Sequence, residues 1–283
     1  MLGLVVTSVE QGLVFGIMVL GVYVTCKVLD FSDLTVDGSF PLGAAVASIL
    51  IFKGGNPFLA LLLAAAAGMV AGYITGFLNT KGKITGLLAG ILTMTALYSI
   101  NLRVMGRSNV TLLNAKTIFT YIETWGIPHQ WIFIATFIVS AAVIKVLLDS
   151  FLKTQLGFAI RATGDNSSMA RALGVNTDAM RTLGLSVSNG LVALSGALVA
   201  QYQGFSDIGM GIGTIVAGLA SVIIGEMIVG EKSIGFATFS VLIGSFIYRL
   251  SIGIALRLGF AATDLKLLTT ILVIIALSTP QIR

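Results

Sequence analysis

The chain has 283 residues, of which 56% are hydrophobic and only 10% are charged, and its mean hydropathy is +1.00. Because a soluble domain carries about 25% charged residues, this composition excludes a surface that faces water on all sides. It indicates a polytopic helical membrane protein. The net charge of +5 is interpreted as topology signals between spans rather than as a nucleic-acid surface.

Nine apolar segments follow one another along the chain, and most approach the length of about 20 residues that spans a bilayer as a helix. They cover residues 9–28, 38–53, 57–79, 84–103, 129–151, 179–203, 211–229, 233–256 and 265–279. The second and seventh are short and glycine-rich, so we expect broken or re-entrant helices there. The chain is therefore predicted to be a single all-α transmembrane domain, residues 1–283, with about 8–10 membrane segments.

The sequence contains no recognisable catalytic set. Glu10 lies at the outer end of the first segment, where it either contacts a solute or the protein that delivers it, or simply reaches the outer surface. Cys26 is the single cysteine, which excludes an internal disulfide and a cysteine-based metal site. His129 is the single histidine and is interpreted as a polar loop residue rather than a ligand, so no metal site is expected. The stretch 80–84, Thr-Lys-Gly-Lys-Ile, is the nearest approach to a phosphate-binding loop, but it lacks the first glycine and the final Ser or Thr. We expect no enzyme activity and no cofactor in this chain.

Several polar side chains interrupt the apolar segments, where they are costly and usually face the interior or a wet cavity. Thr93 and Thr95 lie near the middle of the fourth segment. Ser186, Ser188 and Asn189 lie near the middle of the sixth. Two interpretations stay open for each of them, a place on a translocation pathway or a hydrogen bond between helices.

Charged residues near the segment ends suggest local pairs. Lys145 and Asp149 are four residues apart and can neutralise each other on one helix face. Glu226, near the inner end of the seventh segment, can reach Lys232. Arg249 lies at a different depth, so no pair between Glu226 and Arg249 is expected.

The second and seventh segments resemble each other when Gly38 is aligned with Gly211. The other matched pairs are Ala44 with Ala217, Ala47 with Ala220, Ser48 with Ser221, and Ile49 with Val222. Because the two segments are predicted to cross in opposite directions, they suggest an inverted repeat of the kind found in transport folds.

A polar segment, residues 157–174, separates two long apolar segments. Asp165 or Asn166 can cap a helix start, residues 167–173 then make about two turns, and Gly174 can end the helix in the left-handed conformation. The pattern predicts a short helix along the membrane surface.

Within this helix, Met169, Ala170, Leu173 and Val175 are expected to pack, whereas Arg171 faces elsewhere. A short helix held between two spans suits the transmission of a push from a partner. An interfacial helix without a partner is the alternative.

Lysines and arginines predict the orientation. If residues 152–178 are cytoplasmic, alternation places nine basic residues inside: Lys27, Lys81, Lys83, Lys153, Arg161, Arg171, Arg181, Lys232 and Arg283. Six then lie outside: Lys53, Arg103, Arg107, Lys116, Arg257 and Lys266. The positive-inside rule therefore predicts an outside N-terminus and a cytoplasmic C-terminus.

Three stretches carry a resemblance to a known family. They are Leu156-Gly157, Arg161-Ala162, Gly164, Asn166, Ala170 and Gly174-Val175 in the polar segment; Glu10-Gln11-Gly12-Leu13 in the first span; and Asp33-Leu34-Thr35-Val36-Asp37-Gly38-Ser39-Phe40 with Leu42-Gly43-Ala44 before and in the second. They resemble the permeases of bacterial ABC importers for branched-chain amino acids, ribose and related solutes, and look closest to the tryptophan/tyrosine-type permeases.

The resemblance implies a permease subunit of the bacterial inner membrane that imports a small polar solute, which we expect to be an aromatic or branched-chain amino acid. It implies a separate cytoplasmic ATPase that binds ATP, an extracytoplasmic solute-binding protein and a second permease copy. It also implies an ATPase-coupling role for Arg161, Gly164, Asp165, Asn166, Met169, Ala170, Arg171, Leu173 and Gly174.

Three rival functions remain. A secondary transporter driven by an ion gradient would need acidic residues buried at mid-membrane, and none is evident in the sequence. A membrane enzyme would need a catalytic set, and a channel would not need the helix within residues 157–174.

Overall fold

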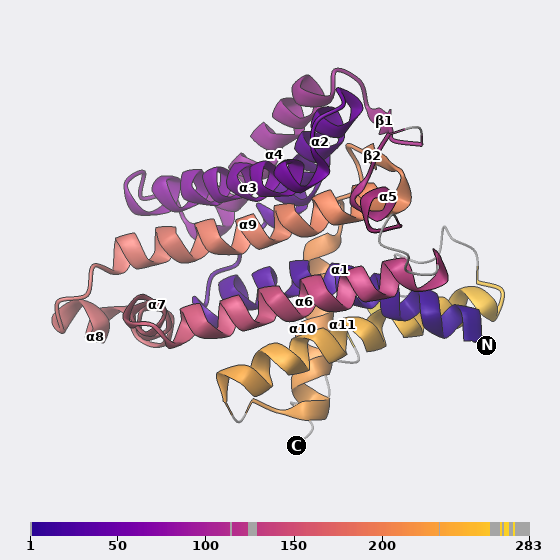
Figure 1. Ribbon diagram of the computed structural model, residues 1–283. Coiled ribbons are helices and arrows are strands. Elements are labelled where there is room, and N and C mark those ends of the chain that lie inside the picture. Colours follow the sequence, from indigo (N-terminus) through magenta and orange to yellow (C-terminus); the bar gives the residue numbers. More distant parts are fainter. Residues whose placement is uncertain are drawn as a thin grey trace.

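The structure is a computed structural model of long helices that run side by side (Figure 1). The residues that it describes are 2–113, 115–123, 129–231, 233–260, 267, 269–271 and 274.

Six helical segments among the described residues are long and apolar enough to cross a membrane. They are α1 (Leu2–Tyr23) with the π-helical turn η1 (Val24–Val28), α3 (Pro57–Thr80), α4 (Gly86–Met105), α6 (His129–Lys153), α9 (Thr177–Gln203) and α11 (Ile234–Arg257). Two shorter apolar helices are α2 (Val36–Phe52) and α10 (Thr214–Val229). The remaining elements are α5 (Ile118–Glu123), α7 (Gln155–Asp165), α8 (Ser167–Ala172), β1 (Asn109–Thr111) and β2 (Phe205–Asp207).

These helices begin and end where the sequence supplies caps. The Asn56 side chain accepts a hydrogen bond from the backbone N–H of Phe58, and Pro57 stands at the first position of α3, where its missing N–H costs nothing. Gly106 ends α4 and Gly204 ends α9, both in the left-handed conformation with φ of +69° and +75° that favours glycine.

Glycines allow the central helix α9 to pack closely against α2 and α3. A Cβ on Gly43 would overlap the backbone of Ala193, and a Cβ on Gly72 would overlap the backbone of Leu185. In lipid there is no hydrophobic driving force that brings helices together, so they associate through van der Waals contacts. Small residues strengthen these contacts because they let the backbones approach closely. A glycine also allows α1 to pack closely on α11, since a Cβ added to Gly12 would lie 2.7 Å from Cα of Phe246.

The two ends of the bundle differ. One end carries α7 and α8, and the opposite end carries α5 and the strands β1 and β2 (Figure 1). The strands form a two-stranded antiparallel sheet in which Val110 pairs with Ser206. We call these the α7–α8 end and the sheet end; α1 begins at the sheet end and η1 reaches the α7–α8 end (Figure 1).

The short helices α2 and α10 both begin inside the bundle. Gly38, in the first turn of α2, lies against Met94 and Leu97 near the middle of α4, and α10 begins beside this turn because Gly211 packs on Asp37. From there α2 runs to the sheet end, whereas α10 runs toward η1 and the α7–α8 end. The expectation of opposite directions agrees with this arrangement, and the sequence repeat itself stays a prediction.

The predicted segments match the helices well, with one omission. The all-α polytopic class is confirmed, and the first eight segments each correspond to a helix. Most of the ninth, 265–279, lies outside the described residues. The helix expected from residue 167 is confirmed as α8, whereas the helix α7 over residues 155–165 was not expected.

Candidate functional site: the α7–α8 segment and the buried junction of α2, α9 and α10

The α7–α8 segment, residues 155–172, consists of two capped helices. The Thr154 hydroxyl accepts a hydrogen bond from the Gly157 N–H at 3.2 Å and starts α7. Asn166 starts α8, since its Oδ1 accepts from the Met169 N–H at 2.9 Å. Of the two predicted caps, Asn166 is therefore the one that acts, and Asp165 is the last residue of α7. Gly174 follows α8 with φ of +86°, as the left-handed stop predicts.

The helix α7 rests on the end of η1. A Cβ on Gly164 would overlap the carbonyl oxygen of Val28 and would lie 2.9 Å from Cα of Leu29. Ile160, one turn earlier, is fully buried. Arg161 lies with its guanidinium carbon 5.4 Å from the centre of the Phe158 ring. Because Gly164 leaves no gap, α7 cannot shift toward η1 without moving it.

The helix α8 presents apolar side chains outward. Met169 is 62% exposed and Leu173 is 74% exposed, whereas Ala170 is buried. Of the apolar residues expected to pack, Ala170 therefore packs within the chain, whereas Met169 and Leu173 do not. Large apolar side chains exposed together mark a contact surface.

Arg171 faces the start of α9 instead. Its guanidinium donates to the Thr177 hydroxyl at 2.8 Å and to Oδ1 of Asp178 at 3.3 Å. The side chain is exposed, so this ion pair contributes little stability, but it ties α8 to the first turn of α9. The expectation that Arg171 faces away from the packed side of α8 agrees with this position.

A buried polar cluster lies at the middle of α9. Asn189 Oδ1 accepts from the Ser39 hydroxyl at 2.6 Å, and its Nδ2 donates to Oδ2 of Asp33 at 2.7 Å and to the Leu185 carbonyl at 3.0 Å. The other carboxylate oxygen of Asp33 accepts from the Thr35 N–H at 2.9 Å. Asn189 is fully buried, and its side chain forms hydrogen bonds between segments. This agrees with the second interpretation of this side chain, a hydrogen bond between helices.

The other intramembrane polar residues bond mostly within their own helices. Thr93, Thr95 and Ser186 each donate to the carbonyl four residues earlier. Ser188 instead donates across to the Gly21 carbonyl at 2.7 Å. Thr95 is exposed and Thr93 is buried, so the structure does not bring these four side chains and Asn189 to one cavity. A pathway role for them stays a prediction.

Asp37 joins the two broken helices. Its Oδ1 accepts from the Ile215 N–H at 2.9 Å and from the Thr214 hydroxyl at 3.0 Å, and its Oδ2 accepts from the Gly213 N–H at 2.9 Å. A carboxylate at this place satisfies the free N–H groups of α10 and complements the positive end of its dipole. Sequence reasoning missed the buried Asp33 and the half-buried Asp37 because both precede an apolar segment. The expectation that no acidic residue lies deep in the bundle is wrong.

Glu10 also differs from expectation. Its side chain is buried, at 7% exposure, and accepts a hydrogen bond from the Tyr202 hydroxyl at 2.9 Å. The expectation that it reaches the outer surface is therefore wrong; it joins α1 to the end of α9.

Charged pairs close the α7–α8 end. Lys27 Nζ lies 2.7 Å from Glu226 and 3.3 Å from Glu231. Glu226 thus pairs with Lys27, while the expected partner, Lys232, lies outside the described residues. The expected pair of Lys145 and Asp149 is confirmed at 2.6 Å.

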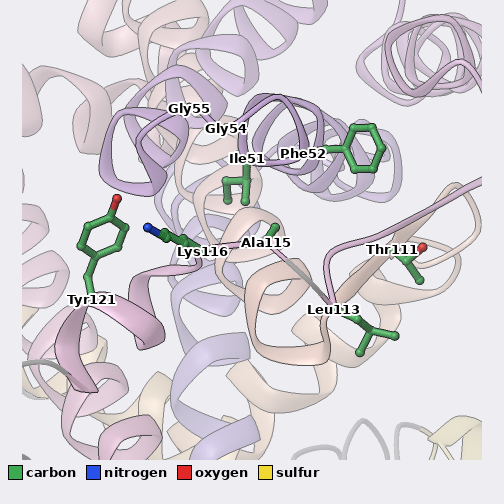
Figure 2. A pocket seen from close by; sticks show the side chains of 9 residues that line it. All are labelled: Ile51, Phe52, Gly54, Gly55, Thr111, Leu113, Ala115, Lys116 and Tyr121. Atoms are coloured by element: carbon green, nitrogen blue, oxygen red, sulfur yellow. The ribbon is translucent and has the colours of Figure 1, made fainter.

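A hollow of about 600 Å³ opens at the sheet end, between the turn after α2 and the segment before α5. Figure 2 shows the Lys116 amino group and the Tyr121 hydroxyl on one side of it and Leu113 and Thr111 on the other. Ile51 also lines it (Figure 2). This hollow is a second candidate contact surface, at the end opposite to α8.

Comparison with known proteins shows that this sequence is similar to the permeases of transport systems. The sequence profile of the family described as branched-chain amino acid transport system, permease component, matches residues 4–278. A tyrosine transport system permease protein of Clostridioides difficile (strain R20291) is 45% identical over 280 residues, which cover 99% of this chain and 92% of that protein.

Two solved structures share the fold. PsaBC from Streptococcus pneumoniae, solved in complex with Fab, is 14% identical with a TM-score of 0.54 and covers 96% of this chain and 89% of its own. A metal-chelate type ABC transporter in an inward-facing conformation is 17% identical with a TM-score of 0.52, over 95% of this chain and 82% of its own. At these identities the likeness concerns the fold alone.

Proposed function

Since the chain belongs to the permease family of branched-chain amino acid transport systems, we propose that it is the membrane-spanning subunit of an ATP-binding-cassette importer for an aromatic or branched-chain amino acid. The tyrosine permease relative supports an aromatic solute. The observation that carries the proposal is the α7–α8 segment, whose capped helix α8 exposes Met169 and Leu173 while α7 abuts η1.

A separate ATPase is the partner for α8. The exposed side chains of Met169 and Leu173 suit insertion into an apolar cleft, and burying such side chains contributes about 1.5–3 kcal/mol each. ATP is then bound by that partner rather than by this chain. This proposal places the α7–α8 end in the cytoplasm, the N-terminus outside and the protein in the bacterial inner membrane.

The sheet end would then receive the solute. The hollow beside Lys116 and Tyr121 (Figure 2) lies where an extracytoplasmic solute-binding protein would dock. A second copy of the chain completes the translocation pathway between two permeases.

Coupling between hydrolysis and transport tests the proposal. The chain is co-expressed with its neighbouring genes, and ATP hydrolysis and uptake of L-tyrosine are measured in proteoliposomes. Gly164→Ala inserts a Cβ against the Val28 carbonyl, an overpacking that costs about 1–3 kcal/mol. We expect uptake per ATP to fall about 5-fold or more, with hydrolysis retained.

Gln155→Ala is the matched control, because Gln155 is an exposed residue of the same helix and should leave coupling unchanged. In the double variant Met169→Ser with Leu173→Ser, the ATPase should no longer co-purify. If the wild-type chain never retains an ATPase, the proposal fails. If Gly164→Ala keeps full coupling, the transmission role of α7 fails.

The buried Asp33 and the half-buried Asp37 are the observation that would favour a second candidate, a secondary transporter driven by an ion gradient. Both carboxylates are already engaged by backbone or side-chain donors, which argues for a structural role. Uptake by vesicles that hold an ion gradient but no ATP would decide for this candidate and against the first.

A further inference from the structure

A cavity of about 440 Å³ lies beside the first turn of α10, between α1 and α11. Its volume is within the range of about 300–1,000 Å³ typical of small-molecule sites. We call it the Arg249 cavity. The lining residues that matter for its chemistry are Phe15, Met210, Thr214, Arg249 and Ile252.

Arg249 provides the positive charge of this cavity. Its guanidinium carbon lies 3.5 Å from the centre of the Phe15 ring, so the cation rests on the aromatic face. Among the residues that the structure describes, Arg249 forms no salt bridge with an acidic side chain. A cation in a membrane segment is costly and usually marks a functional site.

Asp37, which contacts one of the residues that line the cavity, is already engaged. Asp37 contacts Thr214, which lines the cavity, but its two carboxylate oxygens accept from Gly213, Thr214 and Ile215. The charge of Asp37 therefore complements the N-terminus of α10. Within the described part of the chain no acidic side chain pairs with the guanidinium of Arg249, so its donors can serve another anion.

The depth of the cavity suits a transported solute. Phe15 lies near the middle of the candidate span Val5–Val28, and the cavity adjoins the place where the short helix α10 begins. In transporters with discontinuous helices, solute sites lie near the membrane midplane at such breaks. A lipid phosphate lies at the membrane surface, so a carboxylate is the anion that fits this depth.

We propose that the Arg249 cavity binds the transported amino acid, with Arg249 holding its carboxylate. The planar guanidinium binds a carboxylate through two parallel hydrogen bonds. The Thr214 hydroxyl, which donates to Asp37, keeps lone pairs that can accept from the solute ammonium group. Phe15, Met210 and Ile252 provide an apolar wall for an aromatic or branched side chain.

This inference rests on the proposed function, because it names the solute contact of the same importer. The test uses the complete complex with its ATPase in proteoliposomes. The readouts are the Kd and KM for L-tyrosine and L-leucine, and competition by L-tyrosinamide, which lacks the carboxylate.

Arg249→Gln should raise the KM and Kd for the favoured amino acid at least 10-fold, and Arg249→Lys should restore part of the affinity because it keeps the charge without the bidentate geometry. L-Tyrosinamide should compete weakly against the wild type, and its competition should be unchanged in Arg249→Gln, because it has no carboxylate for Arg249 to bind. Arg257→Gln, at the exposed end of α11, is the matched control and should leave both constants unchanged.

Two results would overturn the inference. Unchanged KM and Kd in Arg249→Gln, in a complex that still transports, would remove Arg249 from the solute site and leave the proposed function standing. Loss of association between permease copies in Arg249→Gln and Arg249→Lys, with unchanged Kd, would instead assign Arg249 to an acidic residue of the second copy. A wild-type complex that hydrolyses ATP without uptake of any amino acid would contradict the proposed function itself.

Discussion

The bond between Asp33 and Asn189 is the interaction whose removal gives the clearest energetic signature. Asn189→Leu keeps the volume of the side chain but leaves the Ser39 hydroxyl without its acceptor and Oδ2 of Asp33 without its donor. Both groups belong to fully buried residues. A buried polar group that loses its partner costs about 1–3 kcal/mol, and more when it is charged. We therefore expect Asn189→Leu to lower the free energy of unfolding by about 2–6 kcal/mol.

The double variant is the sharper part of this prediction. Asp33→Leu alone leaves the Thr35 N–H without its acceptor, and it costs a similar amount. Replacing both partners by apolar groups of similar shape removes the orphaned carboxylate and amide together. The cost of Asp33→Leu with Asn189→Leu should therefore fall short of the sum of the single costs by about 1–3 kcal/mol.

Reversible unfolding in mixed detergent micelles measures these differences. Thr95→Val is the control, because Thr95 is exposed and its hydroxyl bonds only within α4, and its effect should stay within about 0.5 kcal/mol. Single costs that add to the double cost within about 0.5 kcal/mol would refute the reasoning, since residues in contact should be coupled.

Two further variants test the packing and the charge pairs. Gly43→Val pushes a branched side chain into the backbone of Ala193, so the protein should fail to accumulate in the membrane. Gly54→Ala is the control: Gly54 is exposed, and the strain of its φ of +81° should lower the free energy of unfolding by only about 1–2 kcal/mol. Lys27→Met removes the partner of the mostly buried Glu226 and should lower the thermal midpoint by an amount corresponding to about 1–3 kcal/mol; Glu226→Gln added to it should recover part of the loss, and no recovery would contradict the pair.

The membrane segments were predictable because length and hydropathy suffice for them. A run of about 20 apolar residues has few alternatives to a helix in lipid, so the eight segments and the helices agree. The caps of α8 were predictable as well, because Asn166 and Gly174 act on their immediate neighbours. These are local properties, and a sequence displays them directly.

The helix α7 was missed because its signals are local but weak. It contains glycines at 157 and 164, which lower helix propensity, and its start depends on Thr154, which lies before the polar segment. Only the structure shows why these glycines are tolerated. Gly164 allows contact with Val28, and Gly157 lies against Leu152.

The partners of Asn189 could not be predicted for a different reason. Asn189 stands out in an apolar segment, but Asp33 and Ser39 are about 150 residues away in sequence. Asp33 lies in a connection between helices that the composition places at the membrane surface. Burial of that connection follows from the close packing of α2 on α9, which depends on glycines from both halves of the chain.

The bond between Asp33 and Asn189 also bears on how a push at the α7–α8 segment would reach the membrane interior. The helix α7 abuts Val28, which leads through the connection after η1 to Asp33, while α8 is tied by Arg171 to the start of α9, which carries Asn189. The two routes meet in one buried bond, which joins the connection after η1 to α9.

Beyond this bond the contacts continue to the cavity. Asp33 and Asn189 hold the start of α2, and Asp37 in the next turn holds the N-terminus of α10, whose first residue lines the Arg249 cavity. A contiguous set of contacts does not by itself demonstrate coupling. It does lead to a test. If the contacts transmit the push, Asn189→Leu should lower uptake per ATP and leave both ATPase binding at α8 and amino acid affinity at Arg249 intact.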